Sequence, residues 1–289
     1  MKRKHILAVP FLVSALACSY NARFGSSNNK VPGHDFVVPI IQADQEVTKQ
    51  VLDAYKNFDY EKLQNSDWKA CRTYYGKIKL PTLHAQQIDQ VLETIIVETP
   101  KERTQHWTTG AYVSYLIEKS YAAGNNNFVL HTKDAVIDHI GVDIGGTKTE
   151  PLRLTIEGNV GARSLLFATY ANITVNGNIG EKSVVDANHT SITANGNVGD
   201  YCFFSVKNTT GAFYGTVGVN LAVDAENSDL AIYGTVGNKV GLRSKNCTFR
   251  TSVAETYEML QRWAGQPYSM NDLQLVDEKG VLIKSIVLK

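Results

Sequence analysis

Two aspartates in the second half of the chain have a spacing that could support acid–base chemistry. Asp186 and Asp224 are 38 residues apart, twice the 19-residue interval at which glycine recurs in this region. If repeat units stack about 4.8 Å apart, these carboxyl groups lie about 9–10 Å apart on one face. That separation is near the upper limit for the two carboxylates of an inverting glycosidase. The alternative is that both are solvated surface charges, the commoner role of single aspartates on a repeat face.

Other candidate site residues also share positions in the repeat. Tyr214 and Tyr233 are 19 residues apart, and such a pair either binds sugar faces or forms only a packing ladder. Glu181 and Asp200 have the same spacing, which brings them close enough to share a cation or a proton. The histidines are dispersed and the cysteines have no CxxC spacing. The sequence therefore predicts no metal site and no cofactor.

A glycine-rich segment precedes the repeats. Residues 141–149 read Gly-Val-Asp-Ile-Gly-Gly-Thr-Lys-Thr and resemble the first phosphate motif of the ROK sugar kinases. The resemblance implies a strand, a glycine-rich turn and a threonine that hold ATP phosphates. Those kinases also need a second phosphate motif and a catalytic aspartate, whereas repeats follow here. We interpret Gly145 and Gly146 as the turn into the first regular repeat, and keep a ROK-like kinase as a remote alternative.

The elements that position these residues follow from the repeat itself. Each unit has a Gly-x-x-Gly block in which Val or Ile follows two positions after the first glycine, and apolar residues alternate with polar ones in short runs. The first glycines of the five blocks are Gly158, Gly177, Gly196, Gly215 and Gly234. This pattern predicts a mainly β chain: a single-stranded parallel β-helix of 19-residue coils, with about five or six regular coils. We expect the glycines at corners that need positive φ or close backbone approach.

The same blocks resemble a known repeat domain. Tandem Gly-x-x-Gly blocks at this period are similar to the GXGXG β-helix domain, which occurs in formylmethanofuran dehydrogenase and in the large subunit of glutamate synthase. The sequence Ile192 to Gly199 also resembles uncharacterised archaeal proteins with tandem "GNVG" repeats. In the enzymes this domain is structural, so the resemblance implies a scaffold without catalytic residues. It covers about residues 150–253.

The flanking segments are expected to cap the repeats. Apolar spacing predicts helices within residues 43–125, an α-helical domain, with the β-helix over residues 126–253. Residues 254–289 are predicted to form a small C-terminal cap, a helix plus a hairpin. Ser252 and Glu255 have the spacing of a capping box for that helix. Both caps would cover strand edges that are otherwise unpaired.

The N-terminus has the pattern of an export signal. Basic residues precede a 12-residue apolar run, Ile6 to Ala17, and small residues precede Cys18. This predicts a signal peptide over residues 1–17 and a linker over residues 18–42. Cys18 is a candidate lipidation site and membrane tether. We expect an exported or cell-surface protein; the alternative is a cytoplasmic one.

Composition narrows the function only by exclusion. The 289 residues carry a net charge of +1 and 43% hydrophobic residues, with no basic stripe, so nucleic acid is not an expected partner. The leading hypothesis is a non-catalytic scaffold or interaction protein whose helical domain binds a partner. The alternative is a carbohydrate-binding or polysaccharide-active protein. The sequence favours a non-enzyme without deciding it, and both protein and glycan partners stay open.

Overall fold

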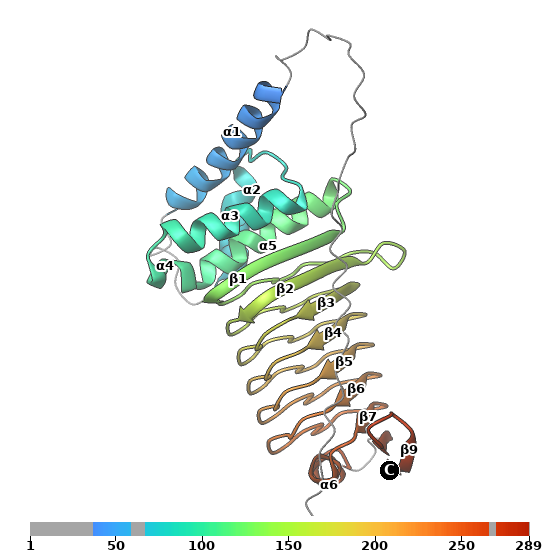
Figure 1. Cartoon of the computed structure of the whole chain (residues 1–289). Helices are drawn as coiled ribbons and strands as arrows, with labels where there is room; N and C mark the ends of the chain where they lie inside the picture. The colour runs from blue at the N-terminus through green and yellow to red at the C-terminus, as the bar shows by residue number, and fades with distance from the viewer. Residues whose placement is uncertain (1–36, 59–66, 266–269, 289) are drawn as a thin grey trace, which may run out of the picture. The chain divides into compact units, whose positions relative to one another are not determined.

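The fold combines helices with one extended sheet. The computed structural model describes residues 37–58, 67–265 and 270–288, so the expected signal peptide and Cys18 lie outside the described residues. The described part contains six helices and nine strands, and the strands form a single sheet in the order β1 to β9 (Figure 1). Neighbours from β1 to β8 run parallel and β9 runs antiparallel to β8. This is an α/β fold, and the prediction of a mainly β, single-stranded parallel β-helix is wrong.

The β-helix prediction is wrong because each repeat forms only one short strand. The sequence pattern predicts several short strands in each coil, but each repeat contributes one short strand to the sheet and is otherwise turns and isolated bridges. The strands are β1 (Asn127–Ile137), β2 (Leu152–Val160), β3 (Ala171–Val175), β4 (Ser191–Ala194), β5 (Thr210–Phe213), β6 (Asp229–Ile232), β7 (Thr248–Thr251), β8 (Asn271–Val276) and β9 (Leu282–Leu288). From β2 to β7, register partners such as Ile173 and Ile192 are 19 residues apart.

The segment after each Gly-x-x-Gly block is not a strand. Residues five, seven and nine positions after the repeat glycine have positive φ, as in Lys182, Val184 and Asp186. Their backbone N–H groups donate alternately to the following and the preceding repeat: Lys182 donates to Asp200, and Val184 donates to Ser164. Side chains such as Val184 and Phe203 are buried by this backbone. Period-two spacing here therefore reflects alternating left- and right-handed residues rather than extended pairing.

The repeat glycines are required by close approach. A Cβ on Gly177 would lie 2.2 Å from the carbonyl oxygen of Gly158, and one on Gly234 would lie 2.0 Å from that of Gly215. Only Gly158 among these first glycines has positive φ. Of the two reasons that the sequence suggested, close backbone approach therefore applies throughout the repeats.

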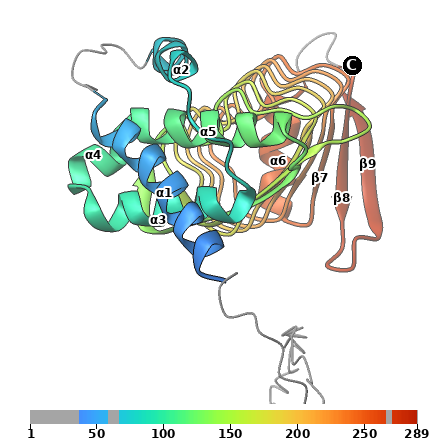
Figure 2. The ribbon, with the colours of Figure 1, turned by 90° about the horizontal axis from the view of Figure 1, so that it is seen from above.

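Helices occupy most of the described chain before the sheet. They are α1 (Val37–Lys56), α2 (Trp68–Lys77), α3 (Ala85–Glu98), α4 (Lys101–Gln105), α5 (Trp107–Ala122) and, after β7, α6 (Ala254–Trp263). The chain divides into two compact units, residues 1–40 and 41–289, and the sheet belongs to the second. Within that unit, α3, α4 and α5 contact β1, and α2 packs on α5. Figure 1 shows these helices at the β1 end of the sheet, and Figure 2 shows them from above.

Buried apolar stripes hold these helices in place. On α3, Ile88, Val91, Leu92 and Ile95 are almost fully buried at helical spacing. The helix begins with a capping box in which Gln87 N–H donates to His84 Nδ1 and the Gln87 side-chain oxygen accepts from His84 N–H. Such reciprocal bonds satisfy backbone donors that a helix start leaves free.

The C-terminal cap differs in detail from the prediction. The N-cap of α6 is Val253, without a side-chain cap hydrogen bond, so the predicted capping box of Ser252 and Glu255 is wrong. The Thr251 hydroxyl instead accepts a hydrogen bond from Val253 N–H at 3.1 Å. The predicted hairpin is present, but its strands β8 and β9 extend the main sheet.

Candidate binding groove

The two candidate aspartates occupy different environments. Asp224 accepts two hydrogen bonds of 2.6 Å from the guanidinium of Arg243. This pairing lowers the pKa of Asp224, so the carboxyl group stays ionised and is unsuited to act as a general acid. Asp186 is exposed. Asp224 is therefore engaged by Arg243 on this repeat face rather than left free for acid catalysis.

The other predicted carboxylate pair is also engaged in local contacts. Asp200 accepts a hydrogen bond from Val219 N–H at 2.8 Å, and Glu181 forms an ion pair with Lys182 at 3.3 Å. Across the described ranges, no group of three or more His, Cys, Asp or Glu side chains could hold a metal ion. The pair therefore has the contacts of repeat packing rather than of an ion site.

The rings of Tyr214 and Tyr233 stack on each other. Their centroids are 4.9 Å apart and their planes differ by 11°, while the residues are 54% and 40% exposed. Because the rings stack, the two facing sides are not available to a sugar. Sugars are held by ring faces, so this geometry favours the packing-ladder alternative.

The glycine-rich segment lacks the context of a phosphate site. It leads into β2, which begins at Leu152, rather than into a helix whose N-terminus could face a phosphate. Asp143 pairs with Arg72, which also pairs with Glu118. Gly145 bridges Thr169 of the next repeat, which agrees with its interpretation as an entry turn.

Three titratable groups near the start of α5 and the end of β1 have shifted pKa values. Burial lowers the pKa of His139 to about 4, and burial also lowers the pKa of His106 and raises that of Asp138. The Nδ1 atom of His139 has no hydrogen-bond partner in the described part of the chain. Burial is the leading cause of all three shifts, as expected where titratable side chains are packed against apolar neighbours.

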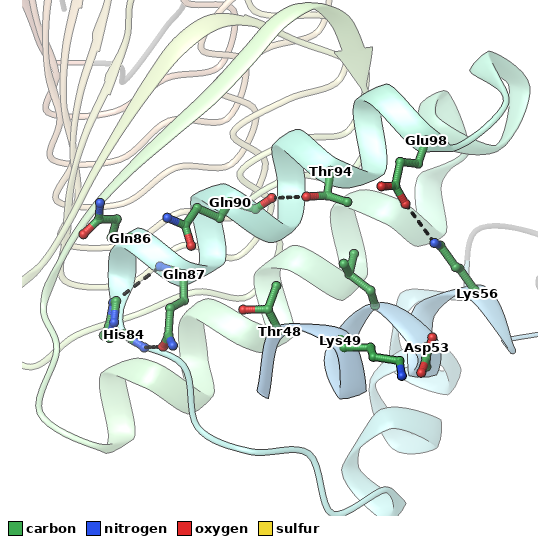
Figure 3. Close-up of a pocket in the computed structure, with 11 residues that line it drawn as sticks. Thr48, Lys49, Asp53, Lys56, His84, Gln86, Gln87, Gln90, Thr94 and Glu98 are labelled. Atoms are coloured by element: carbon green, nitrogen blue, oxygen red, sulfur yellow. Dashed lines mark hydrogen bonds and ion pairs between the residues drawn. The ribbon is translucent and has the colours of Figure 1, made fainter. Parts of the chain in front are cut away.

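The most site-like feature is a polar groove between α1 and α3 (Figure 3). Its volume is about 790 Å³. It runs from the His84–Gln87 capping box to an ion pair of 2.9 Å between Lys56 and Glu98. Its lining residues are Thr48, Lys49, Leu52, Asp53, Lys56, His84, Gln86, Gln87, Gln90, Thr94 and Glu98.

The buried faces of α1 and α3, which point away from the groove, hold its two walls in place. Val51 and Tyr55 of α1 are buried, and the Tyr112 hydroxyl of α5 donates to the Val51 carbonyl at 2.7 Å. This docking leaves Lys49 and Asp53 exposed on the groove side, across from the exposed residues Gln86 and Gln90 of α3. None of these four side chains forms a hydrogen bond within the described residues.

Sequence reasoning missed the groove, although a signal was present. Gln86, Gln90 and Thr94 recur at a spacing of four residues, which places them on one face of a helix opposite its apolar stripe. A row of uncharged polar residues on a helix is otherwise typical of a solvated face. Only the position of α1 shows that this row has a facing wall.

Comparison with known proteins does not identify a family or a function for this chain. Comparisons of the chain with protein-family models, with curated proteins and with solved structures find no match, and the resemblance to GXGXG domains stays a prediction. No helix within the described ranges is both long and apolar enough to cross a membrane. The geometry of the chain itself is therefore the basis for inferring its function.

Proposed function

We propose that this chain is a non-catalytic interaction protein that binds an extended segment of a partner protein in the groove between α1 and α3. The observation that carries the proposal is the two-walled polar groove itself, with side chains from both helices that have no partner in the described structure. Exposed amides and charges with no internal partner are available to a ligand without first breaking a bond.

The chemistry of the walls fits a polypeptide. Gln86 and Gln90 each offer an amide that both donates and accepts, which matches the N–H and C=O groups of an extended backbone. Lys49 and Asp53 add one charge of each sign, which suits a polar segment with mixed charges. Leu52 is the one apolar side chain of the lining, whereas small-molecule sites are predominantly apolar.

The length of the groove sets the length of the segment. From Gln86 to Glu98, α3 rises by roughly 18 Å at 1.5 Å per residue. An extended chain advances about 3.3 Å per residue, so about five or six residues of a partner fit between the two ends. Among the described lining residues there is no Phe, Tyr or Trp, which favours a peptide over a glycan as the occupant.

Selection from a random heptapeptide library displayed on phage tests this proposal. We expect the full chain to enrich a set of peptides, and Gln90→Arg to weaken their binding at least about tenfold, or 1.4 kcal/mol, since the longer charged side chain would fill the groove. The matched control is Val97→Arg, because Val97 is 74% exposed on the same helix and does not line the groove.

Calorimetric titration with the selected peptides gives the affinities, and thermal unfolding confirms that both variants are folded. Failure to enrich any peptide would overturn the proposal. So would equal loss of binding in Gln90→Arg and Val97→Arg, because the effect would then depend on added charge rather than on the groove.

A further inference from the structure

The far end of the sheet exposes an apolar strand. β9 is the last strand in the sheet order and has β8 as its neighbour. Four apolar residues in or beside it are largely exposed: Val281 at 60%, Leu282 at 54%, Ile283 at 63% and Val287 at 54%. An edge strand with unpaired N–H and C=O groups and apolar side chains is a template for a further strand.

The opposite end of the same sheet is protected within the chain. Asp89 of α3 accepts hydrogen bonds from the backbone N–H and the ring of His131 on β1, both 2.8 Å. Glu93 of α3 pairs with Lys133 of β1 at 3.0 Å. At the other end, α6 contacts β7 and β8, and Figures 1 and 2 show no described helix beyond β9. One edge is therefore blocked and the other is open in the described structure.

Lys284, the charged residue of β9, does not prevent another strand from pairing with this edge. Lysine on an edge strand normally opposes strand addition, and Lys284 is the only charged residue among Leu282–Leu288. Its Nζ lies 5.3 Å from the centre of the Tyr257 ring on α6, so the side chain is held toward the molecule's own helix. The edge thus keeps its apolar character.

We infer that β9 pairs antiparallel with β9 of a second copy of this chain. A two-fold axis at Ser285 pairs residues 283–287 of the two copies, with Ser285 facing Ser285. On the Ile283 face, Ile283 meets Val287 twice, which buries four exposed branched side chains. Lys284 faces Ile286, so the two lysines are not opposed. A self-pairing strand gives an isologous contact that closes after two copies.

The mass of the full chain in solution tests the pairing. Light scattering coupled to size exclusion across the micromolar range is expected to show a concentration-dependent rise toward twice the 31.9 kDa chain mass. The double variant Ile283→Lys/Val287→Lys is expected to remain at the single-chain mass. Its matched control is Val129→Lys/Val136→Lys, because both valines are 40% exposed on β1, and this variant should still dimerise.

A cross-link tests the register. In the inferred pair, Ser285 faces its own copy with Cβ atoms about 4.5–5.5 Å apart, so Ser285→Cys should form a disulfide-linked dimer on mild oxidation. Lys279→Cys, in the turn before β9, is the control, and the parent chain with Cys18 gives the background. Three results would each overturn the inference: a single-chain mass at every concentration, a dimer that survives Ile283→Lys/Val287→Lys, or no faster cross-linking of Ser285→Cys than of Lys279→Cys.

Discussion

Buried hydroxyl and thiol groups satisfy the main chain between repeats. Ser183 donates to the carbonyl oxygen of Gly161 at 3.3 Å, and Cys202, one repeat later, donates to that of Gly180 at 3.2 Å. Cys247 makes the same kind of bond to Ala225. Burial raises the pKa of the Cys202 thiol to about 12, so it stays protonated and unreactive. These cysteines therefore act as small buried donors rather than as a redox set.

Two substitutions of Cys202 distinguish the contribution of its hydrogen bond from that of the thiol group itself. Cys202→Ser keeps a donor at a position where Ser183 already serves, and we expect its free energy of unfolding to stay within about 1 kcal/mol of the parent. Cys202→Ala leaves the Gly180 carbonyl without this bond and opens a small void, so we expect a loss of about 1–3 kcal/mol. Urea unfolding followed by circular dichroism measures both. Equal stability of the two variants would show that the bond contributes nothing.

At the scale of elements, α3 is the link between the helices and the sheet. It forms one wall of the groove and covers the β1 edge through Asp89 and His131. The hydrogen bond to Asp89 is the leading cause that raises the pKa of His131. Contact between α3 and β1 should therefore depend on pH, since the pair is strongest when His131 is protonated.

The sign of this dependence follows from the raised pKa. A histidine whose folded pKa lies above its unfolded value of about 6.5 stabilises the fold fully below that value, and loses this effect as pH rises through the folded pKa. His131→Gln keeps the backbone N–H that Asp89 also accepts. We expect the parent to exceed this variant by about 0.2–1 kcal/mol at mildly acid pH, and the difference to shrink above neutrality.

Thermal unfolding of both proteins between mildly acid and mildly alkaline pH checks this. His189→Gln is the control, because His189 is an exposed histidine that stacks on Tyr170 and pairs with no carboxylate of the described chain. A stability difference that grew with pH would contradict the assignment of the His131–Asp89 pair.

A helix can be predicted from the sequence where it has a clear apolar stripe. The buried spacing of Ile88, Val91 and Ile95 identifies α3 from the sequence alone. Helix α2 lies within the segment expected to be helical, residues 43–125, but no apolar stripe marks it, because its buried face has only Cys71 and Tyr75 amid polar neighbours. Asp67, whose side chain accepts from Ala70 N–H at 3.0 Å, is the N-cap signal that could have indicated it.

At the scale of the whole molecule, the sequence predicts which residues stack but not the architecture. Asparagines 19 residues apart form a ladder: the side-chain oxygen of Asn159 accepts from Asn178 N–H, and that of Asn178 from Asn197 N–H, both 2.8 Å. The single sheet was not predictable, because left-handed residues such as Val184 and Phe203 have the same alternation as a strand. The groove depends on how two helices dock, which no local pattern encodes.

The spacing between repeats depends on the absence of a side chain at the repeat glycine. A Cβ on Gly196 would lie 2.5 Å from the Gly177 carbonyl oxygen. Because the backbone fixes the position of Cβ, only a separation of adjacent repeats could relieve this contact. We expect Gly196→Ala to destabilise the chain by about 1–3 kcal/mol or more. At Gly76 of α2, a Cβ would have no atom within 4 Å, and Gly76→Ala should stabilise its helix by roughly 0.5–1 kcal/mol. Opposite shifts in unfolding temperature for these two identical substitutions would show that close stacking sets the stability of the sheet, whereas parallel shifts would contradict it.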